Sequence, residues 1–341
     1  MPRFSIISLL LPTLLAAHGL SKKSLSPTGA LTAFFVGFAM ISGSTGGPGG
    51  EGLGLKVWGV SLIGFYLLGS RATKCTVPMP SALNQSISDG KSKKAKLEAS
   101  YHDAGYGNRS GWQVLSNSFS AVVACTAWNI LFVPQGVHAW AWTALSTATG
   151  GALKSPSVLK TYTSDGWCPV SGDVGAGWSR ALLFAALGHF ACCLGDTLAS
   201  ELGILSPSPP RLITTGQTVP PGTNGGVSVG GTFASFAGGL TMGVIMSVCL
   251  ILENSACRSD GYTVFGTLVL WGGLGGLGGS GLDSLLGATI QMTRYDDERK
   301  LIVEDGGKEQ LKVISGWDIL TNNQVNVVSS LCCAIIIGLL A

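Results

Sequence analysis

The feature that most constrains this chain is a series of eight apolar stretches, each long enough or nearly long enough to cross a lipid bilayer. A membrane-spanning helix needs about 20 mostly apolar residues. The stretches comprise residues 4–20, 28–42, 55–69, 114–133, 181–194, 230–252, 263–282 and 325–341. They predict an all-α, polytopic integral membrane protein. About eight helices, with seven to nine as the range, would pack as one bundle in a single domain over residues 1–341.

Composition supports a lipid environment and excludes other classes of protein. Only 11% of the 341 residues are charged, compared with about 25% in soluble proteins, and the mean hydropathy is +0.42. A disordered chain needs the opposite balance of charge and hydrophobicity. The net charge of +3 is too small for a typical nucleic-acid binder. We therefore expect the lipid bilayer as a partner and no nucleic acid.

Residues 138–153 form a ninth apolar stretch that is short for a span and rich in Ser and Thr. The distribution of Lys and Arg decides between the topologies, because these residues gather on the cytoplasmic side. Eight spans place 15 of them on one face and 6 on the other, whereas nine spans give 13 and 8. We therefore predict a cytoplasmic loop at 71–112 with a flexible Ser- and Lys-rich part. The loop at 134–179 is predicted to be non-cytoplasmic, with 138–153 as an interfacial segment.

The N-terminus permits two interpretations. Residues 1–19 have the basic start, apolar middle and small-residue exit of a secretory signal peptide. The interpretation we favour is an uncleaved first span, flanked by Lys22 and Lys23. The signal-like start favours the endoplasmic reticulum or another endomembrane over a plastid. The nine cysteines show neither metal-binding spacing nor a disulfide framework.

Acidic residues at the ends of two spans are the first candidates for chemistry, because charges within a membrane are costly. Asp196 and Glu201 follow the fifth stretch and Asp283 follows the seventh, so all three reach the cytoplasmic face in the eight-span topology. Asp196 and Glu201 lie about 140° apart around a helix, so a shared ligand requires that the helix end bends. Such oxygen ligands suit Mg²⁺. An equally weighted alternative is that the acids only mark helix ends at the membrane surface.

A glycine-rich loop and several polar side chains are predicted on the same face. Glycines allow successive backbone N–H groups to point at one anion, and Arg and Lys are standard phosphate partners. The alternatives are a tight turn before a helix and basic anchors at the lipid headgroups. The candidate phosphate-binding residues are Thr223, Asn224, Gly225, Gly226 and Ser228 in the loop, with Lys74, Arg109, Gln113 and Asn117 elsewhere.

Gly273, Gly275 and Gly278 match a dinucleotide-binding spacing, but this match lies inside an apolar span with no preceding strand. Small residues at such spacing are typical of close helix packing in membranes. We therefore interpret these glycines as packing residues.

Five segments, taken together, resemble the transmembrane protein 19 family, which includes the plant phytyl phosphate kinase. They occur in the family's order and cover most of the chain, although Leu198 stands where Trp is common in the family. The segments are QVLSN at 113–117, GDTLASELG at 195–203, PRLITT at 210–215, GTNGGVS at 222–228 and DSLLGATIQ at 283–291.

The resemblance implies a membrane kinase that transfers a phosphoryl group from ATP or CTP to a prenyl monophosphate. We hypothesise that Asp196, Glu201 and Asp283 hold Mg²⁺ and that the backbone of residues 223–228 cradles the nucleotide phosphates. Lys74 and Arg109 would neutralise the acceptor phosphate, with Gln113 and Asn117 orienting it. The rival hypotheses are a lipid or small-molecule transporter or scramblase, and a non-catalytic structural membrane protein.

Overall fold

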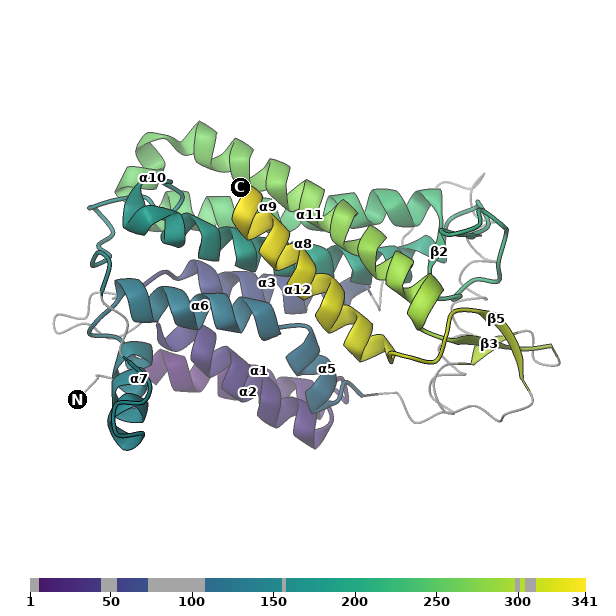
Figure 1. Cartoon of the computed structure of the whole chain (residues 1–341), viewed down its shortest axis with the longest axis horizontal. Helices are drawn as coiled ribbons and strands as arrows, with labels where there is room; N and C mark the ends of the chain where they lie inside the picture. Colours follow the sequence, from purple (N-terminus) through teal and green to yellow (C-terminus); the bar gives the residue numbers. More distant parts are fainter. Residues whose placement is uncertain (1–5, 44–53, 73–107, 155–157, 298–300, 304–310) are drawn as a thin grey trace.

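The computed structural model describes residues 6–43, 54–72, 108–154, 158–297, 301–303 and 311–341. Long helices run side by side and make up most of the described chain (Figure 1). Each coincides with one of the eight predicted apolar stretches. They are α1 (Ile6–Ser21), α2 (Pro27–Ser42), α3 (Val57–Ala72), α6 (Phe119–Phe132), α8 (Trp178–Gly203), α9 (Val229–Glu253), α11 (Gly261–Ile290) and α12 (Asn322–Leu340).

Helix α8 lies at the centre of the bundle, where it packs against α3, α6, α9, α11 and α12. Its middle is buried on all sides and includes Phe184, Leu187 and Phe190. Helix α1 packs mainly against α2. These two helices occupy one edge of the bundle, and α9 and α11 the opposite edge (Figure 1).

Glycine brings α8, α9 and α11 into backbone contact. A Cβ atom on Gly276 of α11 would lie 2.5 Å from the carbonyl oxygen of Ser235 on α9, and one on Gly195 of α8 would lie 2.9 Å from the carbonyl oxygen of Gly276. No larger residue fits at these positions without moving a helix. The predicted packing role holds for Gly273 and Gly275, which face neighbouring helices, whereas Gly278 faces open space.

Three of the described helices, α8 with its preceding turn, α9 and α12, are by themselves long and apolar enough to cross a membrane. A fourth candidate is the pair α6 and α7 (Val137–Ala148), which is bent by 85°. Helices α1, α2 and α3 are apolar and have 16 residues each. The predicted doubtful stretch at 138–153 therefore begins as a helix that turns sharply away from α6.

Five short strands correct the all-α prediction. Strands β1 (Arg211–Leu212) and β2 (Gly226–Val227) pair in antiparallel fashion. Strand β3 (Thr293–Asp296) lies between β4 (Leu301–Val303) and β5 (Lys312–Ser315), again antiparallel. Both sheets lie in connections between helices at the same end of the bundle (Figure 1). The fold is therefore mostly helical, with two small sheets outside the helical region.

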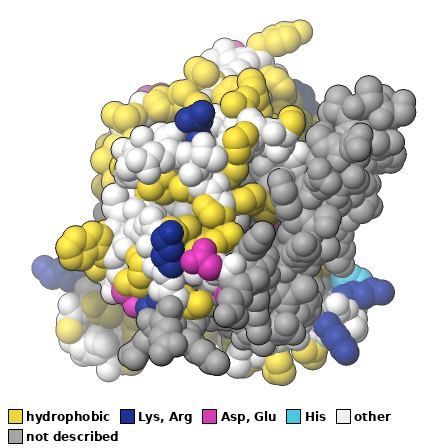
Figure 2. Space-filling view, turned by 90° about the vertical axis from the view of Figure 1, so that its right-hand side faces the viewer, with side chains coloured by type: hydrophobic (Ala, Val, Ile, Leu, Met, Phe, Trp, Pro, Cys, Tyr) yellow, Lys and Arg dark blue, Asp and Glu magenta, His cyan; other side chains and the backbone are white. Residues whose placement is uncertain are grey.

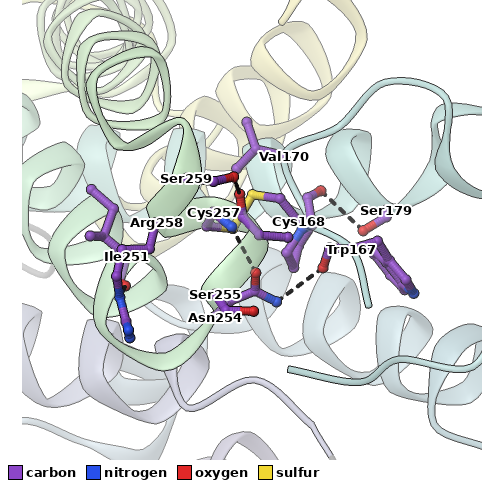
Figure 3. Close-up of a disulfide and its surroundings, with 12 residues drawn as sticks. Trp167, Cys168, Val170, Ser179, Ile251, Asn254, Ser255, Cys257, Arg258 and Ser259 are labelled. Carbon is purple, nitrogen blue, oxygen red and sulfur yellow. Dashed lines mark hydrogen bonds between the residues drawn. A yellow bond between two sulfur atoms is a disulfide. The ribbon is translucent and has the colours of Figure 1, made fainter. Parts of the chain in front are cut away.

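At the opposite end lies a disulfide, although the cysteines show no disulfide framework in the sequence. Cys168, in the loop after α7, is bonded to Cys257 in α10 (Ser255–Ser259). The buried Asn254 joins the same two segments, because its side-chain amide donates to the carbonyl oxygen of Trp167 and its side-chain oxygen accepts from the N–H of Cys257 (Figure 3). The spacing of the cysteines could not reveal this pairing, since it joins residues 89 positions apart.

We predict that Gly276→Ala destabilises the protein, by about 1–3 kcal/mol, because the added methyl group overpacks the contact with α9. Gly278→Ala is the matched control, since a Cβ atom there meets nothing within 4 Å. Alanine also stabilises a helix interior by about 0.5–1 kcal/mol relative to glycine. Thermal unfolding of both variants in one detergent measures the difference. A Gly276 variant as stable as the Gly278 variant would contradict the packing role.

We also predict that Cys257→Ser lowers the stability by about 2–5 kcal/mol, the usual effect of losing a native disulfide. Adding a reductant to the wild-type protein should have the same effect. Cys332→Ser is the control, because Cys332 is not part of a disulfide. Thermal unfolding with and without reductant measures this effect. An unchanged melting temperature after mass spectrometry has shown full reduction would exclude a stabilising role for the bond.

Candidate functional site

One large cavity, of about 1430 Å³, lies at the end of the bundle away from the disulfide. Its polar part is formed where α3 and α8 end, where α9 and α12 begin, and by the loop that joins α8 to α9. Figure 2 looks onto this end, where basic and acidic side chains lie among apolar ones. All of the predicted site residues that the structure describes line this cavity, while Lys74 lies outside the described residues.

Asp196 and Asp283 form an acidic pair between α8 and α11. The Ser280 hydroxyl donates to Asp196 Oδ1 at 3.4 Å, and the Ser329 hydroxyl of α12 donates to Asp283 Oδ2 at 2.7 Å. The two carboxyl groups lie close enough to interact electrostatically. The pair depends on the glycine contacts, because Gly195 immediately precedes Asp196 and lies against Gly276 of α11. Three helices therefore hold two carboxyl groups at one side of the cavity.

Glu201 does not join this pair. Helix α8 continues without a break to Gly203, so the bend that would bring Glu201 round to Asp196 is absent. Glu201 instead interacts electrostatically with Arg109. Within the described residues, no three His, Cys, Asp or Glu side chains are grouped to hold a metal ion. The predicted three-carboxylate metal site is thus reduced to the pair Asp196 and Asp283.

Arg109 is anchored by its backbone to the turn between α1 and α2. Its N–H donates to the Ser24 carbonyl oxygen at 3.2 Å, and its carbonyl oxygen accepts from the Ser26 N–H at 3.0 Å. Burial lowers the pKa of its guanidinium, while the nearby Tyr66 and Glu201 oppose that shift. An arginine stays protonated at any physiological pH. Arg109 therefore supplies a positive charge to the cavity that holds the acidic pair.

Gln113 and Asn117 already have structural roles in the short helix α5 (Gly111–Ser116). Gln113 forms a capping box with Ser110, in which its side-chain oxygen accepts from the Ser110 N–H at 2.9 Å. The Asn117 amide donates to the Gln113 carbonyl oxygen at 2.9 Å. Both residues line the cavity, but these bonds occupy part of the hydrogen-bonding capacity that the predicted phosphate-orienting role would use.

The glycine-rich loop is used differently from the predicted phosphate cradle. The N–H groups of Thr223, Asn224 and Gly226 donate to the Pro220 carbonyl oxygen, the Thr293 hydroxyl and the Thr223 carbonyl oxygen, respectively. These three donors are therefore not free for an anion in this conformation. The Ser228 hydroxyl accepts from the Gly231 N–H and caps α9.

Gly225 shows what the loop does instead. It has a φ of 75°, in the left-handed region that favours glycine. A Cβ atom there would lie 2.5 Å from the Ser284 carbonyl oxygen of α11 and would also contact Ala288. The loop therefore packs directly on α11, one turn beyond Asp283, and closes this side of the cavity.

Several residues that line the cavity were not among the predicted site residues. Lys22, Lys23 and Arg71 entered the sequence analysis only as cytoplasmic charges. Their predicted position on the same face as the acidic residues was a signal that they could line the same site. Ser280 lies three residues before Asp283 and so shares its helix face, which was a second signal. Nothing in the sequence indicates a site role for Ser329, because its contact with Asp283 depends on how α12 is rotated. The described cations that line the cavity are Lys22, Lys23, Arg71 and Arg109.

Comparison with known proteins identifies the family. The model of the integral membrane protein family DUF92 matches residues 10–334. The chain belongs to this family. It is 32% identical to Protein PGR of Arabidopsis thaliana over 336 residues. The aligned region covers 97% of this chain and 94% of the relative. The predicted family membership is therefore confirmed, as is the prediction of an integral membrane protein.

Two microbial proteins are similar to parts of the chain. An uncharacterized membrane protein of Methanocaldococcus jannaschii is 35% identical over 137 residues, 39% of this chain and 51% of the relative. One from Synechocystis is 39% identical over 115 residues, 33% of this chain and 40% of the relative. No solved structure matches the chain.

We predict that Gly225→Ala loosens the loop from α11, because the new methyl group meets Ser284 and Ala288. Gly216→Ala is a closely matched control, since Gly216 also has a positive φ, of 69°, but has no neighbour within 4 Å of a Cβ atom. The strain of alanine at a positive φ is common to both variants. Overpacking against α11 lowers the stability by a further amount of about 1–3 kcal/mol, and it does so only in Gly225→Ala. Hydrogen exchange of residues 211–228 measures it. Equal protection in the two variants would show that the contact with α11 does not hold the loop.

Proposed function

We propose that this chain is a membrane-embedded phosphotransferase that converts a prenyl monophosphate, of the phytyl type, to its diphosphate with ATP or CTP as donor. The observation that carries the proposal is that the described lining of one cavity combines an acidic pair, four cations and an apolar region between helices. A lipid phosphate needs the apolar region for its chain and the cations for its phosphate. Phosphoryl transfer needs mainly positioning and charge neutralisation. The family membership is consistent with this assignment.

The proposed topology has all eight long helices crossing the membrane, with the cavity at the cytoplasmic face. Sixteen residues of helix extend only about 24 Å, and a bilayer adapts to short spans by local thinning. The excess of Lys and Arg on the cavity side supports the orientation. The Cys168–Cys257 bond supports it independently, because disulfides persist on the oxidising side of a membrane. We accordingly propose an endomembrane such as the endoplasmic reticulum.

Asp196 and Asp283 are the proposed ligands of Mg²⁺. Mg²⁺ is usually held by one or two carboxylates together with substrate phosphates, so two acids are a sufficient protein contribution. Ser280 and Ser329 orient the two carboxyl groups through the hydrogen bonds that they donate. When bound, Mg²⁺ would neutralise charge on the donor phosphates.

The cations that line the cavity would receive the acceptor phosphate. The backbone of Arg109 is held to the α1–α2 turn, so the point from which its side chain enters the cavity is set by main-chain hydrogen bonds. In the proposed step, an oxygen of the prenyl monophosphate forms a bond to the γ-phosphorus of the nucleotide. The bond from that phosphorus to the bridging oxygen breaks, and the nucleoside diphosphate leaves. The remaining candidates would act by positioning, Glu201 through its interaction with Arg109 and Gln113 and Asn117 through α5, which follows Arg109.

A lipid transporter or scramblase is the second candidate, because an apolar region that joins a polar cavity would also suit a lipid moving between leaflets. A kinase and a transporter are separated by their products. Only the kinase yields a diphosphate, and only the transporter moves the lipid phosphate across a sealed vesicle without changing it.

The test uses the purified full-length protein in lipid nanodiscs with Mg²⁺, either ATP or CTP, and phytyl, farnesyl or geranylgeranyl monophosphate. We expect a prenyl diphosphate that is lost with a chelator and restored by Mg²⁺. Asp196→Asn and Asp283→Asn should each lower the rate by roughly 100-fold or more, the scale of losing one electrostatic group in an active site.

Asp260→Asn is the matched control, because Asp260 precedes the same helix as Asp283 but lies at the disulfide end. Its rate should equal that of the wild type. The absence of a diphosphate product in every combination of donor and acceptor would end the kinase assignment. Full activity of Asp196→Asn would overturn the metal assignment alone.

A further inference from the structure

The large cavity extends from its polar part into an apolar arm between α1, α2 and α3. Its lining changes from charged to apolar along α1 and α3 and is apolar along α2. On α3 the lining residues run from Arg71 and Ser70 through Leu67 and Tyr66 to Ile63 and Leu62. On α2 it ends at Ile41. The arm therefore points away from the acidic pair and into the level of the membrane helices.

The depth of the arm follows from helix geometry. Leu62 lies nine positions before Arg71 on α3. At about 1.5 Å per position, the distance between them along the helix axis is roughly 14 Å. On α1, Pro12 lines the arm at a comparable distance from Lys22. Pro12 also packs against α2, because a Cβ atom on Gly37 would lie 3.0 Å from the Pro12 Cβ atom. Three helices thus contribute apolar side chains at the same deep level.

We propose that this arm holds the hydrocarbon chain of the lipid substrate and that Ile41, Leu62 and Ile63 at its deep end set the longest chain accepted. The inference rests on the proposed function and makes it more specific. A phosphate bound by Arg71 and Arg109 directs the attached chain down the arm, because the lining residues at its deep end, Ile41, Leu62 and Ile63, are apolar. A chain longer than the arm meets these three side chains.

Apolar pockets discriminate chain length by whether a methylene group fits or clashes. The volume at residue 63 should therefore decide the preferred substrate in both directions. Ile63→Phe fills the deep end, so farnesyl monophosphate should be favoured over geranylgeranyl monophosphate by at least about 10-fold in kcat/KM relative to the wild type. Ile63→Ala empties it and should shift the ratio in the opposite direction.

Val60→Phe and Val60→Ala are the matched controls. Val60 lies on the same helix, is 41% exposed, and does not line the cavity. Both controls should keep the wild-type ratio of the two substrates. If the Ile63 and Val60 pairs behave alike in an active enzyme, the arm does not select the chain and the inference is overturned.

A binding experiment separates this inference from the proposed function. A prenyl monophosphate with a photoreactive diazirine at the far end of its chain is added to the protein in nanodiscs, and the crosslinked residues are identified by mass spectrometry. Labelling of the segments around Ile41 and Ile63 supports the chain subsite even when no diphosphate is produced. Labelling only at bilayer-exposed positions such as Val60 overturns it, whether or not the protein is a kinase.

Discussion

The close contact of α8, α9 and α11 through glycine is the constraint on which the rest of the structure depends. Gly195, Gly239 and Gly276 let three backbones approach where any side chain would separate them. Membrane helices gain little from hydrophobic burial against each other, so such close packing is a main source of their association. The same contact places Asp196 beside Ser280 and near Asp283. Helix packing and the candidate site are therefore consequences of the same residues.

The two ends of the bundle are built differently. At one end, the disulfide, Asn254 and a cluster of aromatic side chains around Trp128 and Trp167 tie the loops to the helices. At the other end, a cavity remains open between the helices and is lined by charges of both signs. A cross-linked end opposite an open cavity suits a protein that receives a lipid and a water-soluble ligand from the same side.

Much of the fold could be predicted because apolar stretches and helices coincide in a membrane protein. The end of α8 was the least well predicted boundary, because its last turns carry the polar residues Asp196 to Glu201. These turns nevertheless stay helical and face the cavity. The strands β3 to β5 were hidden in a polar connection with little periodicity. Topology alone predicted that the acids and Arg109 share one end. The hydrogen bond to Asp283 depends on the rotation of its neighbouring helix. The hydrogen bonds of the N–H groups in the glycine-rich loop depend on the conformation of that loop. The sequence reveals neither.

We propose that the cavity and the disulfide face opposite sides of one membrane, with the cavity at the cytoplasm. Single cysteines introduced at two exposed positions test it, Thr214→Cys beside the cavity and Ala152→Cys in the loop that leads to Cys168. They are labelled in sealed microsomes by a maleimide that does not cross the membrane. We predict that Thr214→Cys reacts in intact vesicles and Ala152→Cys only after the membrane is opened. Labelling of both in intact vesicles, or the reverse pattern, would contradict the account.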